Sequence, residues 1–185
     1  MIATEVITPK SLAERNIELA KQIAEDYRSL RPVLVCVMSG SLPFLADLTR
    51  QMKIECETDF IKLTKYGEGS EVRLTMDTAT NLHRRHVLIV KGIVDTGFTT
   101  RLLQSMLGER NCASLRTVTL LDRANSRILD VPIEYRGFEV GEEFLVGYGL
   151  DWNGTLRNLP SIWAILDMAG FASDPHAITN PMDSD

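Results

Sequence analysis

Two uninterrupted apolar runs constrain the fold of this chain more than any other feature of its sequence. They cover residues 33–38 and 87–90 and consist largely of valine, leucine and isoleucine, and a third strand is expected over residues 115–121. Runs without polar alternation are typical of strands that are covered on both faces, as in a parallel sheet. Because segments of helical spacing separate the runs, the pattern predicts an α/β domain, a Rossmann-like, mostly parallel sheet with helices on both faces.

The segments around these runs predict the other elements. Ser11 and Glu14 have the spacing of a capping box, so we expect a helix from Ser11 to about Ser29, which Pro32 ends. Residues 64–77 are polar and contain two glycines, which favours a loop or a short hairpin. We further expect helices over 42–51 and 99–108 and strands over 54–63, 144–146 and 162–166.

Composition limits the class of protein. The chain has 185 residues, of which 44% are apolar, so we expect one domain over residues 1–171 and a flexible polar tail over 172–185. A net charge of -5 and the lack of a basic stripe disfavour binding to nucleic acid. No signal peptide or membrane-length apolar run is visible, so we expect a cytoplasmic protein without a membrane partner. We expect the three cysteines, Cys36, Cys56 and Cys112, to be buried free thiols.

In a parallel sheet, ligands bind beyond the carboxyl ends of the strands. Three loops lie there: residues 39–41, residues 91–99 and the loop after Leu121. The second is the most informative, because a buried strand leads through Asp95-Thr96-Gly97 into a predicted helix. Free N–H groups and the dipole at such a helix start favour an anion, so the loop has the features of a phosphate site.

Two other interpretations of this loop stay open. Asp-Thr-Gly is also the tripeptide of aspartic proteases, although that motif belongs to all-β surroundings. Alternatively the turn is only a helix cap, with the hydroxyl of Thr96 or Thr99 bonded to free N–H groups.

Five motifs in the same order resemble those of hypoxanthine-guanine phosphoribosyltransferases, which are type I phosphoribosyltransferases. The resemblance implies that family's fold, in which a small hood covers the sheet. It also implies transfer of 5-phosphoribosyl from phosphoribosyl pyrophosphate to hypoxanthine or guanine, giving IMP or GMP and pyrophosphate, with Mg²⁺ as cofactor and a homodimer or homotetramer as the assembly. The motifs cover residues 38–48, 64–67, 87–100, 120–123 and 137–160.

The resemblance also implies roles for individual residues. Asp95 acts as general base toward purine N7, and it holds the 5-phosphate together with Thr96, Gly97, Phe98 and Thr99. The purine is bound by Arg123, Phe144, Leu145 and Asp151, and the pyrophosphate by Ser39, Gly40 and Arg157. Asp151 binds Mg²⁺, while Lys65 and Tyr66 begin the flexible lid.

Each of these residues also has a plainer interpretation. Phe144 could be an ordinary core residue, and Arg123 could cap a strand end. Asp151 and Arg157 could form a surface ion pair.

Arg123 stands where the family usually has lysine. An arginine has only donors, so it can bond O6 of a 6-oxopurine but meets another donor in the amino group of adenine. The residue therefore predicts specificity for 6-oxopurines.

The chain departs from the family in the loop that binds the ribose. Lys91 and Gly92 replace two acidic residues that accept hydrogen bonds from the ribose hydroxyls. Ser39 replaces a common lysine, and the lid after Tyr66 is shorter, with Lys65 in place of a serine. These changes leave three hypotheses. The chain is an active transferase with altered ribose contacts, a catalytically impaired purine-nucleotide-binding homologue that could be regulatory, or a transferase with a different phosphorylated donor whose added anion meets Lys91.

Overall fold

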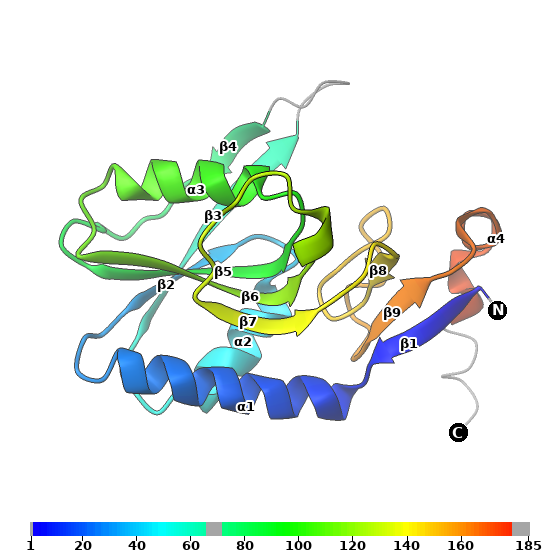
Figure 1. The fold of residues 1–185 in the computed structure, drawn as a ribbon, viewed down its shortest axis with the longest axis horizontal. Coiled ribbons are helices and arrows are strands. Elements are labelled where there is room, and N and C mark those ends of the chain that lie inside the picture. The colour runs from blue at the N-terminus through cyan, green and yellow to red at the C-terminus, as the bar shows by residue number, and fades with distance from the viewer. Residues whose placement is uncertain (1, 66–71, 179–185) are drawn as a thin grey trace.

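The computed structural model describes residues 2–65 and 72–178, and a six-stranded sheet forms its centre (Figure 1). The strands follow the spatial order β4-β3-β2-β5-β6-β7, and all neighbours are parallel except β4, which is antiparallel to β3. Five strands therefore end at the same edge of the sheet. The strands are β2 (Val33–Val37), β3 (Glu57–Lys65), β4 (Val72–Met76), β5 (His86–Val94), β6 (Ser114–Asp122) and β7 (Tyr135–Glu139).

Helices cover both faces of this sheet, as the apolar runs predict. Helices α1 (Pro9–Asp26) and α2 (Leu42–Gln51) lie on one face, and α3 (Phe98–Gly108) lies on the other (Figure 1). Alternate residues of the central strands enter different cores: Leu88 packs in the core with α1 and α2, whereas Ile89 packs in the core with α3. Burial on both faces explains why these strands contain no polar alternation.

A smaller antiparallel sheet forms the hood beside the main one (Figure 1). Its order is β1-β9-β8, with β1 (Ala3–Ile7), β8 (Phe144–Val146) and β9 (Ile162–Ile165). Helix α4 (Met168–Ser173) and the 3-10 turn η2 (Pro175–Ile178) follow β9. Ile178 is buried in a cluster with Phe171, so the chain is packed at this point of the expected tail, and residues 179–185 lie outside the described part.

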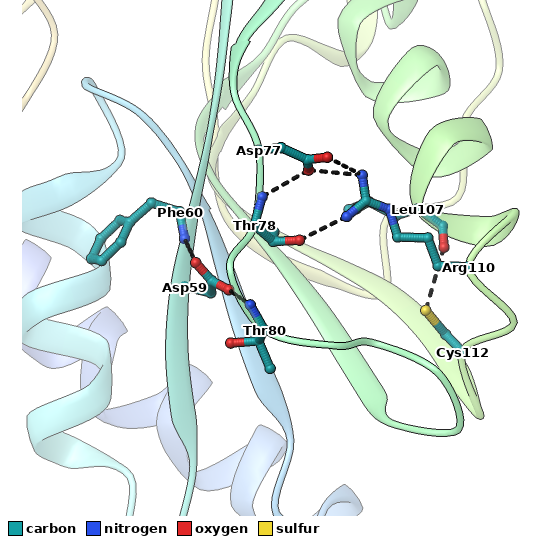
Figure 2. Close-up of polar contacts among 8 residues, drawn as sticks. All are labelled: Asp59, Phe60, Asp77, Thr78, Thr80, Leu107, Arg110 and Cys112. Carbon is teal, nitrogen blue, oxygen red and sulfur yellow. Dashed lines mark hydrogen bonds and ion pairs between the residues drawn. The ribbon is translucent and has the colours of Figure 1, made fainter.

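The connection that follows β4 is fixed by two carboxylates (Figure 2). Asp77 accepts two hydrogen bonds from Arg110, at 2.7 and 2.8 Å, just beyond the end of α3. Asp59 on β3 accepts the backbone N–H groups of Phe60 and Thr80, each at 2.7 Å. The base of the β3–β4 hairpin is thereby tied to both β3 and α3.

The start of α1 differs from the prediction. The helix begins at Pro9, and the hydroxyl of Thr8 accepts the N–H of Ser11 at 3.2 Å. The predicted capping box at Ser11 is wrong, because Thr8 as N-cap and proline in the first turn start the helix earlier. The helix also ends at Asp26, before the expected Ser29.

Strand boundaries differ as well. Strand β5 continues through Lys91 to Val94, because its pairing with β6 extends that far, so the predicted loop over residues 91–99 begins too early. Strand β3 covers Glu57–Lys65 rather than 54–63, and β4 pairs with it, which confirms the hairpin alternative for residues 64–77. Strands β1 and β7 were not predicted, since both are short and only partly buried.

The described part of the chain bears on two expectations based on composition. No described helix combines the length and the apolar character needed to cross a membrane. The three cysteines are free, and Cys36 is buried, whereas Cys56 and Cys112 are only half-buried.

Candidate functional site

The candidate site lies where the parallel strands end and the hood approaches them. Gly92, near the end of β5, donates its N–H to Ser41 Oγ of the loop after β2 at 2.8 Å. Arg123, directly after β6, donates its N–H to the carbonyl of Val94 at 2.9 Å. The loops expected to bind substrate therefore meet at this edge of the sheet.

The turn at Asp95–Gly97 presents an open helix start. Gly97 is the N-cap of α3 with a φ of 95°, and no described side chain caps the helix. A Cβ atom at Gly97 would lie 2.4 Å from the carbonyl oxygen of Leu129, so only glycine fits. The carbonyl of Thr96 fixes the turn by accepting the N–H groups of Ile128 and Leu129, each at 3.0 Å.

This geometry decides between the interpretations of the turn. The helix-cap alternative is wrong, because neither Thr96 nor Thr99 bonds a first-turn N–H through its hydroxyl. The protease alternative requires all-β surroundings, whereas this turn joins a parallel strand to a helix. The first-turn N–H groups and the positive end of the helix dipole remain available to an anion.

Asp95 and Arg123 face each other beside this turn. Arg123 Nη1 lies 3.3 Å from Asp95 Oδ2, and its Nη2 donates to the backbone carbonyl of Glu143, directly before β8. Its Nε is buried and has no hydrogen-bond partner in the part of the chain that the structure describes. Asp95 is 47% exposed, so a ligand can reach the carboxylate. Through its contacts with Val94, Asp95 and Glu143, Arg123 connects the end of β6, the turn and the hood, which is more than a strand cap.

Aromatic side chains form one wall of the hood near Arg123. Phe144 is 37% exposed, which excludes the interpretation as an ordinary core residue. Its ring meets Trp152 edge to face, with centroids 5.5 Å apart and planes at 88°, and Trp152 meets Phe171 at 5.3 Å. Leu145 is buried and follows Phe144 on β8, an edge strand that pairs only with β9.

Trp152 was not identified from the sequence, although an aromatic residue directly after Asp151 was a usable signal. It supports Phe144 from the side, and an edge-to-face pair of this kind holds the partner ring in place.

The loop after β2 is held by close backbone contacts between glycines. A Cβ atom at Gly149, in the turn after β8, would lie 2.1 Å from the carbonyl oxygen of Gly40, and one at Gly92 would lie 3.1 Å from the same oxygen. Arg157 Nη1 donates to the carbonyl of Gly149 at 2.6 Å. Gly40 and Arg157, both predicted to bind pyrophosphate, are therefore neighbours, and the carbonyl of Ser39 accepts the N–H of Leu42 at the start of α2.

Asp151 is held at the same place. Its Oδ1 pairs with Arg157 Nη2 at 2.8 Å, and its Oδ2 accepts the N–H of Gly154 at 2.8 Å. The ion-pair interpretation of Asp151 and Arg157 is thus confirmed as a contact. The pair adjoins Gly40, so it also borders the candidate site.

Lys91 lies within β5 and not in an open loop, and it is only 7% exposed. Burial, and secondarily the nearby charge of Arg127, lowers the pKa of its ammonium group to about 8. Gly92, its neighbour, faces Gly40 and Ser41. The two positions that replace the family's acidic pair therefore provide a buried cation and a close backbone contact.

Two expected features are not formed by the described residues. No cluster of three or more histidine, cysteine, aspartate or glutamate side chains is present in residues 2–65 and 72–178. Of the lid residues, Lys65 ends β3, and Tyr66 lies outside the described residues.

Comparisons with known proteins agree with this geometry. Residues 4–153 match the family described as phosphoribosyl transferase domain. The hypoxanthine-guanine phosphoribosyltransferase of Streptococcus thermophilus strain CNRZ 1066 is 34% identical over 161 residues, covering 85% of this chain and 89% of the relative. The hypoxanthine phosphoribosyltransferase of Haemophilus influenzae is 37% identical over 168 residues, covering 87% and 94%.

Solved structures show the same similarity. A crystal structure of a hypoxanthine-guanine phosphoribosyltransferase from Bacillus anthracis superposes with a TM-score of 0.86 at 35% identity, covering 90% of this chain and 100% of that one. The hypoxanthine phosphoribosyltransferase of Trypanosoma cruzi gives a TM-score of 0.83, also at 35% identity.

Proposed function

The chain belongs to the hypoxanthine-guanine phosphoribosyltransferases of the phosphoribosyl transferase domain family, enzymes of purine salvage, and from this premise we propose how its residues act. It transfers 5-phosphoribosyl from phosphoribosyl pyrophosphate to hypoxanthine or guanine, releasing IMP or GMP and pyrophosphate. The observation that carries the proposal is the pairing of Asp95 with Arg123 beside the uncapped start of α3.

The 5-phosphate binds at the turn from Asp95 to Thr99. The open N–H groups at the start of α3 donate to its oxygens, and the helix dipole favours its charge. The hydroxyls of Thr96 and Thr99 add donors. With the phosphate held there, the ribose lies toward the loop at residues 39–41, where Gly40 and Arg157 receive the pyrophosphate.

Asp95 accepts the proton from purine N7 as N9 bonds to the ribose. Its carboxylate is accessible and lies beside Arg123, where a general base can reach the purine. Phe144, supported by Trp152, stacks on the purine, and the Leu145 carbonyl accepts from the base.

The residues present fit Mg²⁺ brought in with the substrate. Mg²⁺ is usually held by one or two carboxylates together with substrate phosphates and water. Asp151 provides one carboxylate, and each of its oxygens has a lone pair beyond the bonds to Arg157 and Gly154. When bound, the ion would offset the charge that develops on the leaving pyrophosphate.

Arg123 selects 6-oxopurines. Its buried Nε has no partner among the described residues, so O6 of hypoxanthine or guanine would satisfy a donor that adenine leaves unpaired. Steady-state turnover with hypoxanthine, guanine and adenine tests this role. We expect kcat/KM for adenine to be at least about a hundredfold lower.

A matched pair of variants completes the test. Arg123→Met should narrow the difference in kcat/KM between hypoxanthine and adenine. Arg28→Met, at an exposed arginine beyond α1, should leave that difference unchanged. Comparable turnover of adenine and hypoxanthine by the wild type would refute this role for Arg123.

Two coarser properties complete the proposal. The three free cysteines are consistent with a reducing cytoplasm. By its family resemblance the chain forms a homodimer or homotetramer, which light scattering at micromolar concentration would measure.

A further inference from the structure

Two buried cations lie on β5 and in the loop that follows β6. Lys91 is 7% exposed, and no hydrogen bond or ion pair from the described residues reaches its ammonium group. The side chain of Arg127, directly after the 3-10 turn η1 (Ala124–Ser126), is 14% exposed. Its Nη2 pairs with Asp122, but its Nη1 is buried and has no partner. Both residues therefore hold a donor that nothing in the described chain satisfies.

The position of Arg127 links these cations to the site. Its Cδ would lie 3.2 Å from a Cβ atom at Gly97, so the side chain packs against the phosphate turn. It is also close enough to Lys91 for its charge to lower the pKa of that lysine. Lys91, Arg127 and the turn thus belong to one region.

The charges in this region do not balance. Asp122, the carboxylate paired with Arg127, also accepts a second ion pair from Arg136 Nε at 3.4 Å. Two arginines therefore share one carboxylate, while no described carboxylate pairs with Lys91. Buried cations without a matching anion are unfavourable, and an anionic ligand would offset the excess.

We propose that Lys91 and Arg127 form an anion-binding site that takes phosphate oxygens of a phosphorylated ligand. The proposal deepens the proposed function. It rests on that function in one respect, namely that the ligand is either a nucleotide or the donor phosphoribosyl pyrophosphate. Lys91 replaces a carboxylate that would accept ribose hydroxyls, so recognition shifts from the sugar to the phosphate. The ratio of affinities for phosphorylated ligands and for nucleosides should therefore be larger in this chain than in a chain with a carboxylate at this position.

Calorimetric titration of the full chain tests the site with inorganic phosphate, pyrophosphate, GMP and guanosine. We expect Lys91→Met to weaken binding of at least one phosphorylated probe by about tenfold or more, because a hydrogen bond to a charged group is lost. Binding of guanosine, which has no phosphate, should not change. The probe that loses most shows whether the oxygens come from a phosphate monoester or from a diphosphate.

Two further variants separate this role from general damage. Lys91→Arg keeps the charge and should stay within a few-fold of the wild type, and Lys21→Met, at an exposed lysine on α1, should bind every probe normally. Ligand-free Lys91→Met should also melt at a higher temperature than the wild type, since it removes a buried, unpaired cation. Weaker binding together with a more stable fold cannot result from misfolding.

Equal affinities of wild type and Lys91→Met for phosphate, pyrophosphate and GMP would overturn the proposal. That result can coexist with IMP formation, in which case the transferase function stands and the anion site fails. Conversely, phosphate binding that depends on Lys91 without any IMP formation would support the anion site and refute the proposed reaction.

Discussion

Lys91 illustrates how a single residue can reverse the charge of a site while the backbone around it is kept. The sequence was sufficient to identify the replacement of an acidic residue by Lys91. It could not predict that the lysine is buried or that Arg127 lies near it, because that proximity arises from the folded loop after β6. Arg123 and Asp95, by contrast, were each predicted to face the purine, and their side chains contact each other.

The free energy of unfolding is expected to depend on pH through Lys91. Its pKa falls from 10.5 to about 8 on folding, so between these values the unfolded chain binds the extra proton. Rising pH therefore stabilises the folded chain. The free-energy cost of burying the charged ammonium group is fully present below about pH 8, and it is relieved by roughly 3 kcal/mol near pH 10.5. Urea unfolding of the wild type and Lys91→Met at a series of pH values measures this difference.

Other groups that titrate in this range contribute equally to the free energy of unfolding of both proteins, so their contributions cancel in the comparison with Lys91→Met. Burial raises the pKa of the Cys36 thiol to about 12, so the unfolded thiol loses its proton first and rising pH disfavours the folded chain at that residue. This effect is common to both proteins. A stability difference that stays constant with pH would show that Lys91 is not a buried cation.

At the scale of elements, the unbroken apolar runs were enough to predict β2 and β5, and β6 was predicted although polar residues interrupt its sequence. They could not fix where β5 ends, because Lys91 and Gly92 interrupt the apolar sequence while the pairing with β6 continues. Strand β1 was missed for a related reason: its partner β9 lies at the other end of the chain, and only Ile7 of the strand is fully buried.

The contact between β5 and the loop after β2 makes a prediction at Gly92. A Cβ atom there would lie 3.1 Å from the Gly40 carbonyl oxygen, so Gly92→Ala should displace the loop by a few tenths of an ångström. We expect KM for phosphoribosyl pyrophosphate to rise by about tenfold, since small displacements at a binding site are costly. Steady-state kinetics at saturating hypoxanthine measure this.

Gly108→Ala is the matched control for that substitution. Gly108 ends α3, and a Cβ atom there has no neighbour within 4 Å, so the variant should keep its KM and gain stability. An unchanged KM in Gly92→Ala would mean that the loop does not position the donor.

At the scale of the whole molecule, one buried polar group joins the hood to helices α1 and α2. The hydroxyl of Tyr148, in the turn after β8, donates to Asp47 on α2 and accepts from Asn16 Nδ2 on α1 at 3.0 Å. The sequence predicted the α/β class and implied the hood through family resemblance. This connection was not predictable, because its three members are far apart in the chain and their contact arises only in the folded chain.

Removing this hydroxyl should destabilise the fold. In Tyr148→Phe, the amide of Asn16 loses its described partner, and its Oδ1 already has none, so we expect a loss of about 1–3 kcal/mol in urea unfolding. Asn16→Leu in the same background should restore part of the loss by removing the unpaired amide. If the effects of the two substitutions on the free energy of unfolding simply add, the amide and the hydroxyl do not stabilise each other.

The most direct test of the account is the rate of IMP formation by Asp95→Asn compared with the wild type. The amide keeps the size of the side chain but cannot accept a proton as a carboxylate does. We predict that kcat falls by about 10²- to 10⁴-fold while KM for phosphoribosyl pyrophosphate changes far less. An Asp95→Asn variant that forms IMP at the wild-type rate would contradict the assignment of Asp95 as the residue facing the purine.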